Sequence, residues 1–215
     1  MVVKERRGPI AAPGYRFMLA GVILMVLGLW LSGPLFLVGL ILTGFFTYFF
    51  RDPDRPVPAA AGLIISPADG RIIALERVRE EVFLKQPAQR LSIFMNVFDV
   101  HVNRAPVAGR VQAQHYQPGR YLAANRPEAP DQNEQLAILL KTPAGAEVVM
   151  VQIAGLIARR IISYLQDGDE VVQGERVGLI CFGSRVDLYV PETCQLQVSI
   201  GDKVKAGTSI LGRWP

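Results

Sequence analysis

The sequence predicts a mainly β protein of the α+β class, in which a β-sandwich-like domain follows an N-terminal helical hairpin in a membrane. Three observations lead to this fold class. No charged residue occurs from Phe17 to Phe50, and such a run is typical of membrane segments. From Ala60 onward, short β-branched runs alternate with glycine and proline, a pattern that favours strands. Two glycine-bounded segments of this second part recur, which indicates repeated strand–turn–strand units.

The apolar run divides at Ser32-Gly33-Pro34 into two halves, Phe17 to Leu31 and Leu35 to Phe50. Each half is slightly shorter than the ~20 residues of a transmembrane helix, and proline next to glycine favours a turn. We therefore predict a helical hairpin over about residues 17–50, either two short spans or a re-entrant pair. Residues 1–55 form the expected membrane anchor, and residues 56–215 form the expected globular domain.

Basic residues lie on both sides of the hairpin: Lys4, Arg6, Arg7 and Arg16 before it, Arg51 and Arg55 after it. Positive residues prefer the cytoplasmic side, so we expect the cell (inner) membrane, with the globular domain facing the cytoplasm. A cleaved signal peptide is one alternative, but its apolar region would span only ~7–15 residues. A single bent span with the domain outside is the other.

The composition argues against several classes of function. The net charge is only +4 and no dense Lys/Arg stripe occurs, so nucleic-acid binding has little support. Two cysteines, Cys181 and Cys194, do not make a disulfide framework, and Cys181 is predicted to be a small core residue because its neighbours are apolar. The histidines and cysteines fit no common zinc spacing, so no metal is expected.

The predicted strands are the short apolar runs of the second part: Leu63–Ile65, Ile72–Leu75, Leu91–Val97, Gly109–Ala113, Leu136–Leu140, Glu147–Ile153, Arg176–Cys181, Val186–Val190 and Gln195–Ile200. The stretch from Gln117 to Asp131 is largely polar and contains three prolines, so we predict a loop. Residues 168–174 resemble residues 201–207, and residues 67–72 resemble residues 106–111. Such units are similar to those of lipoyl- and biotinyl-type carriers, but no carrier lysine motif is present, so the pattern concerns architecture alone.

Gly183-Ser184 is the most informative pair of residues. Glycine has no side chain to hinder attack on its own carbonyl, so the serine after it is placed to attack the backbone. A serine hydroxyl needs a base, and of the two histidines His101 is the natural candidate, whereas His115 lies in a polar stretch and is predicted at the surface. Asp69 is the candidate residue to orient the base, because Asp, His and Ser act together in any chain order. Each also has a plain structural interpretation, as a turn serine, a core histidine and a turn aspartate.

Four segments together resemble one family: residues 49–53 (FFRDP), 66–70 (SPADG), 96–104 (NVFDVHVNR) and 182–184 (FGS). In this order they are similar to the phosphatidylserine decarboxylases of the small bacterial and archaeal type. The resemblance implies a precursor that cuts itself between Gly183 and Ser184. Ser184 Oγ would attack the Gly183 carbonyl to give an ester. Elimination and hydrolysis would then leave ammonia and a pyruvoyl group, the covalent cofactor, in place of the serine.

The same resemblance implies that the pyruvoyl ketone reacts with the primary amine of phosphatidylserine and accepts electrons as carbon dioxide leaves, giving phosphatidylethanolamine. His101 would serve as base and later return a proton to the α-carbon. Some members carry a second histidine three residues later, where this chain has Arg104, which leaves His101 as the candidate for both steps. The expected partners are the membrane phospholipid and the long and short chains of the cleaved protein. Candidates to bind the headgroup are Arg51, Arg55, Arg104, Arg159 and Arg160.

Two other functions remain open from the residues alone. A membrane-anchored serine hydrolase would use the same three residues but keep one intact chain. A non-enzymatic, membrane-tethered β-sandwich adaptor would be unaffected by loss of Ser184 or His101. A denaturing gel and an intact mass of the purified protein distinguish these possibilities from a self-cleaving enzyme.

Overall fold

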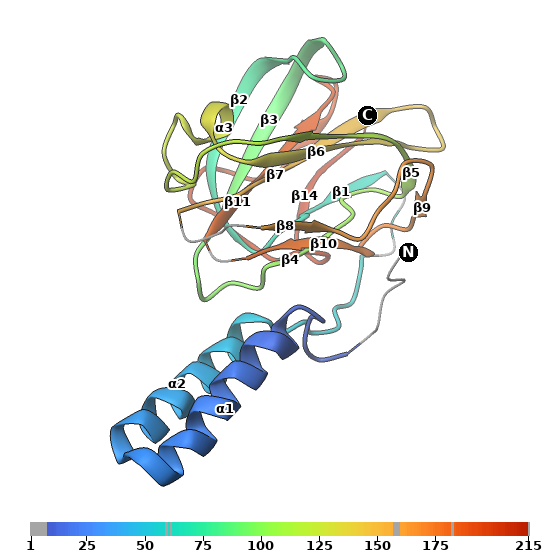
Figure 1. Ribbon diagram of the computed structural model, residues 1–215. Coiled ribbons are helices and arrows are strands. Elements are labelled where there is room, and N and C mark those ends of the chain that lie inside the picture. Colours follow the sequence, from blue (N-terminus) through green and yellow to red (C-terminus); the bar gives the residue numbers. More distant parts are fainter. Residues whose placement is uncertain (1–7, 59, 61, 157–159, 182, 215) are drawn as a thin grey trace. The chain divides into compact units, whose positions relative to one another are not determined.

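The computed structural model describes residues 8–58, 60, 62–156, 160–181 and 183–214. The described residues form two compact units, 8–54 and 55–214, which are drawn in Figure 1 from blue to red along the sequence. Each unit is described separately below.

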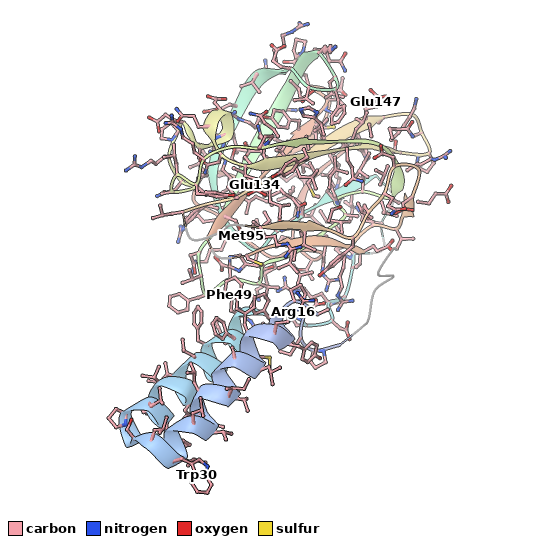
Figure 2. The ribbon with its side chains drawn as sticks, viewed as in Figure 1. Arg16, Trp30, Phe49, Met95, Glu134 and Glu147 are labelled. Carbon is pink, nitrogen blue, oxygen red and sulfur yellow. The ribbon has the colours of Figure 1, made fainter. Side chains whose placement is uncertain are left out.

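The first unit is the helical hairpin. Helix α1 spans Gly14–Leu31 and helix α2 spans Gly33–Phe49, with Ser32 between them. Glycines let the two backbones approach closely, because a Cβ on Gly28 or Gly39 would overlap the main chain of the opposite helix. Large apolar side chains point outward instead, as Trp30 does at the end of the hairpin (Figure 2), where it is 86% exposed.

Small residues between helices and apolar residues outside them are typical of helices that pack in lipid. Among the described helices, α1 is long and apolar enough to cross a membrane, and α2 is apolar but one residue shorter. The predicted hairpin is therefore confirmed as a structural element.

The second unit is built on an eight-stranded antiparallel sheet (Figure 1). The strands in spatial order are β13 (Lys203–Val204), β2 (Gly70–Glu80), β3 (Gln86–Met95), β11 (Ser184–Val190), β7 (Glu147–Ile153), β6 (Gln135–Lys141), β5 (Gly109–Gln117) and β9 (Glu170–Val171). Strand β11 lies in the middle of this sheet, so both of its edges are paired.

Two three-stranded sheets cover one face of the large sheet. One contains β1 (Leu63–Ile65), β14 (Ile210–Arg213) and β12 (Gln195–Leu196), and the other contains β4 (Val102–Arg104), β10 (Arg176–Ile180) and β8 (Ile161–Ser163). Their apolar side chains join those of the large sheet in one buried core. Burial of each such side chain contributes roughly 1.5–3 kcal/mol. The predicted mainly β, sandwich-like fold is confirmed.

Strand β11 is buried on both faces, and its residues alternate between two environments. Val186 and Leu188 belong to the main core, so Ser184 faces the same side, because side chains in a strand alternate with a period of two. Arg185 and Asp187 face the opposite side, where they form a buried ion pair at 2.6 Å. This alternation decides which side of the sheet Ser184 can act on.

The internal repeat corresponds to equivalent strand pairs. Strand β13 pairs with the beginning of β2, Val204 opposite Gly70, and strand β9 pairs with the beginning of β5, Val171 opposite Gly109. The two pairs lie at opposite ends of the eight-stranded sheet.

Some predicted boundaries differ from the structure. A short helix, α3 (Ala129–Gln132), lies in the segment predicted to be a loop. Strand β12 ends at Leu196 rather than Ile200, because the chain then enters a turn in which the Ser199 N–H donates to Asp202. Strands β4, β8, β9, β13 and β14, which have two to four residues each, were not predicted.

Candidate active site

Ser184 is the first residue of β11 and lies opposite Met95, the last residue of β3. Its side chain is fully buried, and its Oγ is 4.0 Å from the Met95 sulfur. Met95 belongs to the main core, so the serine hydroxyl lies at the inner face of the sheet and is shielded from bulk water. The serine thus begins a strand directly after the turn at Gly183.

Gly183, the residue before the serine, has a φ of +54°. Side chains rarely tolerate this left-handed conformation, whereas glycine adopts it readily. A Cβ at Gly183 would have no neighbour within 4 Å among the described residues, so the glycine is needed for its conformation and not for lack of space. The chain thus changes direction at the peptide bond that the sequence marks for cleavage.

His101 reaches this region because β4, which follows it directly, pairs with β10. The Ile180 N–H donates to the His101 carbonyl at 3.3 Å, and Ile180 precedes Ser184 by only four positions. The histidine is 1% exposed, and its Nδ1 lies 3.0 Å from the Asp99 carbonyl oxygen. A carbonyl oxygen only accepts hydrogen bonds, so Nδ1 carries the proton and Nε2 is the basic nitrogen of the neutral ring.

Asp69 is held by a different set of contacts. Its two carboxylate oxygens accept hydrogen bonds from Arg55 at 2.5 and 2.8 Å, and Oδ1 also accepts one from the Ala206 N–H at 2.8 Å. The Asp69 and Arg55 side chains are about one-tenth exposed, so this bidentate pair is largely removed from water. The sequence did not predict the pair, because the two residues are separated by fourteen positions and both looked like loop residues.

One main-chain hydrogen bond joins the segment that carries His101 to the segment that carries Asp69. The Arg104 N–H, three residues after the histidine, donates to the Pro67 carbonyl at 2.9 Å. The main-chain carbonyl of Asp99 fixes the tautomer of His101, which is the task that the sequence assigned to Asp69. A direct role of Asp69 toward His101 therefore stays a prediction.

The remaining candidate arginines lie in different surroundings. Arg51 donates to the Tyr48 carbonyl at 2.7 Å and stacks over the Tyr48 ring. Arg104 is buried and donates to the Gly174 carbonyl at 2.9 Å. Arg160 is exposed, and its carbonyl accepts a hydrogen bond from the Cys181 N–H. Arg159 lies outside the described residues.

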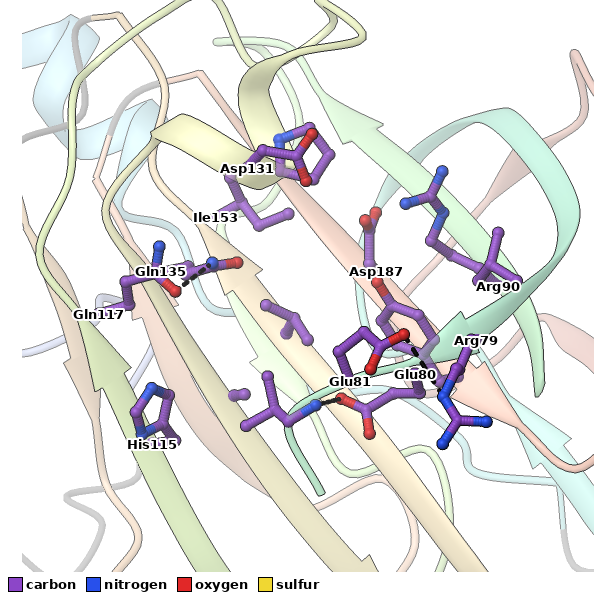
Figure 3. A pocket seen from close by; sticks show the side chains of 16 residues that line it. Arg79, Glu80, Glu81, Arg90, His115, Gln117, Asp131, Gln135, Ile153 and Asp187 are labelled. Atoms are coloured by element: carbon purple, nitrogen blue, oxygen red, sulfur yellow. Dashed lines mark hydrogen bonds and ion pairs between the residues drawn. The ribbon is translucent and has the colours of Figure 1, made fainter. Parts of the chain in front are cut away.

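A polar pocket of about 200 Å³ lies on the other face of the large sheet (Figure 3). Its lining includes Asp187 and Tyr189, whose side chains point away from the face that Ser184 occupies. Glu80 at its rim accepts hydrogen bonds from three N–H groups of the β2–β3 turn. His115 also lines it and is exposed, as predicted. The pocket is thus separate from the candidate triad.

Comparisons with known proteins agree with the motif arrangement. Residues 42–212 match the family described as phosphatidylserine decarboxylase. A protein of Desulfotalea psychrophila is 51% identical over 174 residues, which cover 81% of each chain. A protein of Geotalea uraniireducens is 45% identical over 99% of this chain and 100% of its own length. Both carry the name phosphatidylserine decarboxylase proenzyme.

The chain belongs to the phosphatidylserine decarboxylase family. The predicted family resemblance is therefore confirmed. The matched residues include Asp69, His101 and the Gly183-Ser184 pair, and a relative from Syntrophus aciditrophicus, 44% identical, covers 94% of the chain.

Three features around the candidate residues of this phosphatidylserine decarboxylase family member were not predicted from the sequence. They are the Asp99 carbonyl, the backbone of Gly155 against the Gly183 carbonyl, and a buried amide pair formed by Asn103 and Gln152. Asn103 stands two residues after His101, so its position beside the histidine was the one available signal. The other two depend on strand pairing between distant segments.

Proposed function

We propose that this chain is a phosphatidylserine decarboxylase made as a proenzyme that cleaves itself between Gly183 and Ser184. The mature enzyme converts phosphatidylserine to phosphatidylethanolamine. The observation that supports self-cleavage most directly is the site itself: a buried serine follows a left-handed glycine, and the preceding strand is bonded to the His101 backbone. Family membership supports the reaction.

In this proposal Ser184 Oγ attacks the carbonyl carbon of Gly183, and an ester replaces the peptide bond. His101 is the base, because its Nδ1 proton is held by the Asp99 carbonyl and Nε2 has the lone pair that can accept the hydroxyl proton. Asp69, held in place by two hydrogen bonds from Arg55, is the proposed third residue of the triad, which stabilises the imidazolium form of the histidine.

The surroundings of Ser184 fit a pyruvoyl group formed from that residue. The side-chain position is shielded from water, it faces Met95 and Val186, and both neighbours are uncharged. A ketone at this position would be protected from water. Met95 and Val186, the two neighbours named above, carry no amine that would react with it. When formed, the group supplies an electrophilic carbonyl and an electron sink for loss of carbon dioxide. His101 is the residue of this chain that can return the proton.

The proposal also assigns the chain to the cell (inner) membrane, with the globular domain on the cytoplasmic side. Basic residues at both ends of an apolar hairpin support this orientation. The functional division is then a membrane anchor, residues 1–55, and a catalytic domain, residues 56–215. Cleavage leaves a long chain that ends at Gly183 and a short chain of residues 184–215, which stay together because β11 is paired on both sides with strands of the long chain.

The headgroup carries a phosphate and a carboxylate that must be bound. Arg51, Arg104, Arg159 and Arg160 are the proposed sources of positive charge, whereas Arg55 supports Asp69. Guanidinium groups suit both anions because they donate two parallel hydrogen bonds.

The test is a denaturing gel with intact masses, combined with release of carbon dioxide from two lipids. Phosphatidylserine and an ether lipid with the same serine headgroup are supplied in detergent micelles. Two chains, a pyruvoyl mass on the short chain and carbon dioxide release from at least one lipid are expected. One intact chain with esterase activity would instead identify a serine hydrolase, and no release from either lipid would contradict the decarboxylase function.

A further inference from the structure

Two buried amide side chains connect the large sheet to the small sheet that carries His101. Gln152 of β7 donates from Nε2 to Asn103 Oδ1 of β4 at 2.8 Å. Both residues are 0% exposed. Because the bond engages Nε2, it fixes the orientation of the Gln152 amide and directs Oε1 away from Asn103.

This amide pair lies beside the candidate nucleophile. Gln152 is opposite Val186 in the β7–β11 ladder, so it shares the inner face of the sheet with Ser184. Asn103 Nδ2 lies 3.7 Å from the Met95 sulfur, and Ser184 Oγ lies 4.0 Å from the same atom. Asn103 and Ser184 therefore both contact the same atom, the Met95 sulfur.

Gln152 Oε1 is buried and has no hydrogen-bond partner among the residues that the structure describes. Native proteins seldom leave such an acceptor unpaired, and an unpaired one next to a reactive residue points to a group that binds there later. The Oε1 atom of Gln152 can only accept a hydrogen bond, so the group that binds there must donate one.

The serine headgroup offers one kind of donor. Its phosphate and its carboxylate are ionised at neutral pH and only accept hydrogen bonds, whereas its amino group donates. We propose that Gln152 Oε1, oriented by Asn103, is the binding site for the substrate's amino group beside residue 184. This inference rests on the proposed function and adds to it the residue that recognises the amine.

A neutral acceptor suits this task better than a carboxylate. The amine must be unprotonated to react with a carbonyl carbon, and a nearby carboxylate would raise the pKa of the amine and keep it charged. The amide oxygen positions the amine without adding negative charge. Among the polar neighbours described here, Asn103 and Ser184 are uncharged as well.

The experiment compares Gln152→Met with a matched control, Gln135→Met. Gln135 also donates from its amide to a glutamine, Gln117, at 3.1 Å, but it is on the face of the polar pocket. Three properties are measured on the full chain in detergent: cleavage into two chains, ketone content by reaction with phenylhydrazine, and capture of phosphatidylserine on the short chain. Capture is fixed by cyanoborohydride and read by mass.

We expect both variants to cleave and to contain the ketone. The lipid concentration for half-maximal capture should rise at least about tenfold in Gln152→Met, the effect of losing one hydrogen bond to the amine, and should stay at the wild-type value in Gln135→Met. Equal capture by wild type and Gln152→Met would overturn the proposal. Absence of the ketone from the wild-type protein would contradict the proposed function itself.

Gln152→Glu is the second variant, for the case in which the methionine variant does not cleave. The glutamate has nearly the same shape, and Asn103 can rotate its amide so that Nδ2, which among the described residues now contacts only the Met95 sulfur, donates to the new carboxylate. Cleavage should therefore continue, but the charge should keep the amine protonated and reduce capture at pH 7 at least about tenfold. Wild-type capture by this variant would contradict the proposal. So would failure of both variants to cleave, because Gln152 would then act before any amine is present.

Discussion

The backbone of Gly155 lies directly against the carbonyl oxygen of Gly183, so that a Cβ on Gly155 would overlap that oxygen. Gly155 follows β7, and Gly183 precedes β11, the strand with which β7 pairs. The carbonyl at the proposed cleavage site is thus in contact with a main-chain segment that has no side chain. In the proposed mechanism, this contact limits where the carbonyl can lie when Ser184 attacks it.

Gly155→Ala should slow self-cleavage by about a hundredfold or more, because a displacement near 1 Å at a reacting group has this effect. The time course of appearance of the short chain on a gel measures the rate. Gly109→Ala is the control, since its Cβ would overlap another backbone carbonyl, that of Lys141, far along the sheet. Both variants should lose stability, but only Gly155→Ala should lose cleavage. Normal cleavage in Gly155→Ala would show that the carbonyl position is not constrained.

Ser184→Ala should leave one uncut chain, because it removes the hydroxyl that attacks Gly183. In the wild-type protein, the short chain of residues 184–215 should resist Edman sequencing, because a pyruvoyl terminus has no amine. His101→Ala and Asp69→Ala should slow cleavage by several powers of ten. Overnight incubation followed by intact mass distinguishes a slow site from an absent one. An intact wild-type chain in an active preparation would contradict the pyruvoyl mechanism.

Arg55→Ala should destabilise the globular domain by about 3–5 kcal/mol, because it leaves the Asp69 carboxylate buried without its guanidinium partner. Urea unfolding of the uncut Ser184→Ala background measures the change without interference from cleavage. Arg79→Ala, which breaks the exposed pair with Glu81, should change stability by less than about 1 kcal/mol. In a double-mutant cycle, Arg55→Ala and Asp69→Ala should be clearly non-additive, and additivity would argue against coupling through the pair.

The two cysteines should be poorly reactive in the folded protein. Burial raises the pKa of the Cys181 thiol to about 11, despite the opposing effect of Arg160, and burial likewise raises that of Cys194 to about 11. The reactive thiolate is therefore scarce at pH 8, and iodoacetamide should label native protein about a hundredfold more slowly than protein in urea. Labelling should increase as the pH approaches 11. Mass spectrometry separates the sites, since the proposed cleavage would leave Cys181 in the long chain and Cys194 in the short one.

Removal of residues 1–50 should leave a protein that still cleaves itself. Arg55 belongs to the globular unit, so the truncated chain keeps the contact of Arg55 with Asp69. Its action on phosphatidylserine in vesicles should fall steeply, whereas action on detergent-dispersed lipid should be retained. Vesicle flotation tests membrane binding directly. Tight flotation of the truncated protein would mean that the hairpin is not the main anchor.

Much of the fold could be predicted from local patterns. The uncharged run from Phe17 to Phe50 specified the hairpin, and the β-branched runs specified the longer strands, with Glu147–Ile153 predicted to the residue. The similar segments around Asp169 and Asp202 predicted repeated strand–turn–strand units, and in the structure each segment pairs with the beginning of a longer strand at one end of the large sheet. Local patterns suffice here because periodicity and turn residues report on burial of one face and on backbone conformation.

The sequence by itself therefore determined the fold class, the hairpin, the family and the identity of Gly183, Ser184, His101 and Asp69 as candidates. Only the tertiary structure decided their contacts: Arg55 with Asp69, the Asp99 carbonyl with His101, Gly155 with Gly183, and Asn103 with Gln152. The physical reason is the order of strands in the sheets. It brings together segments far apart in the chain, and that order depends on pairing and packing of the whole domain, which no local pattern encodes.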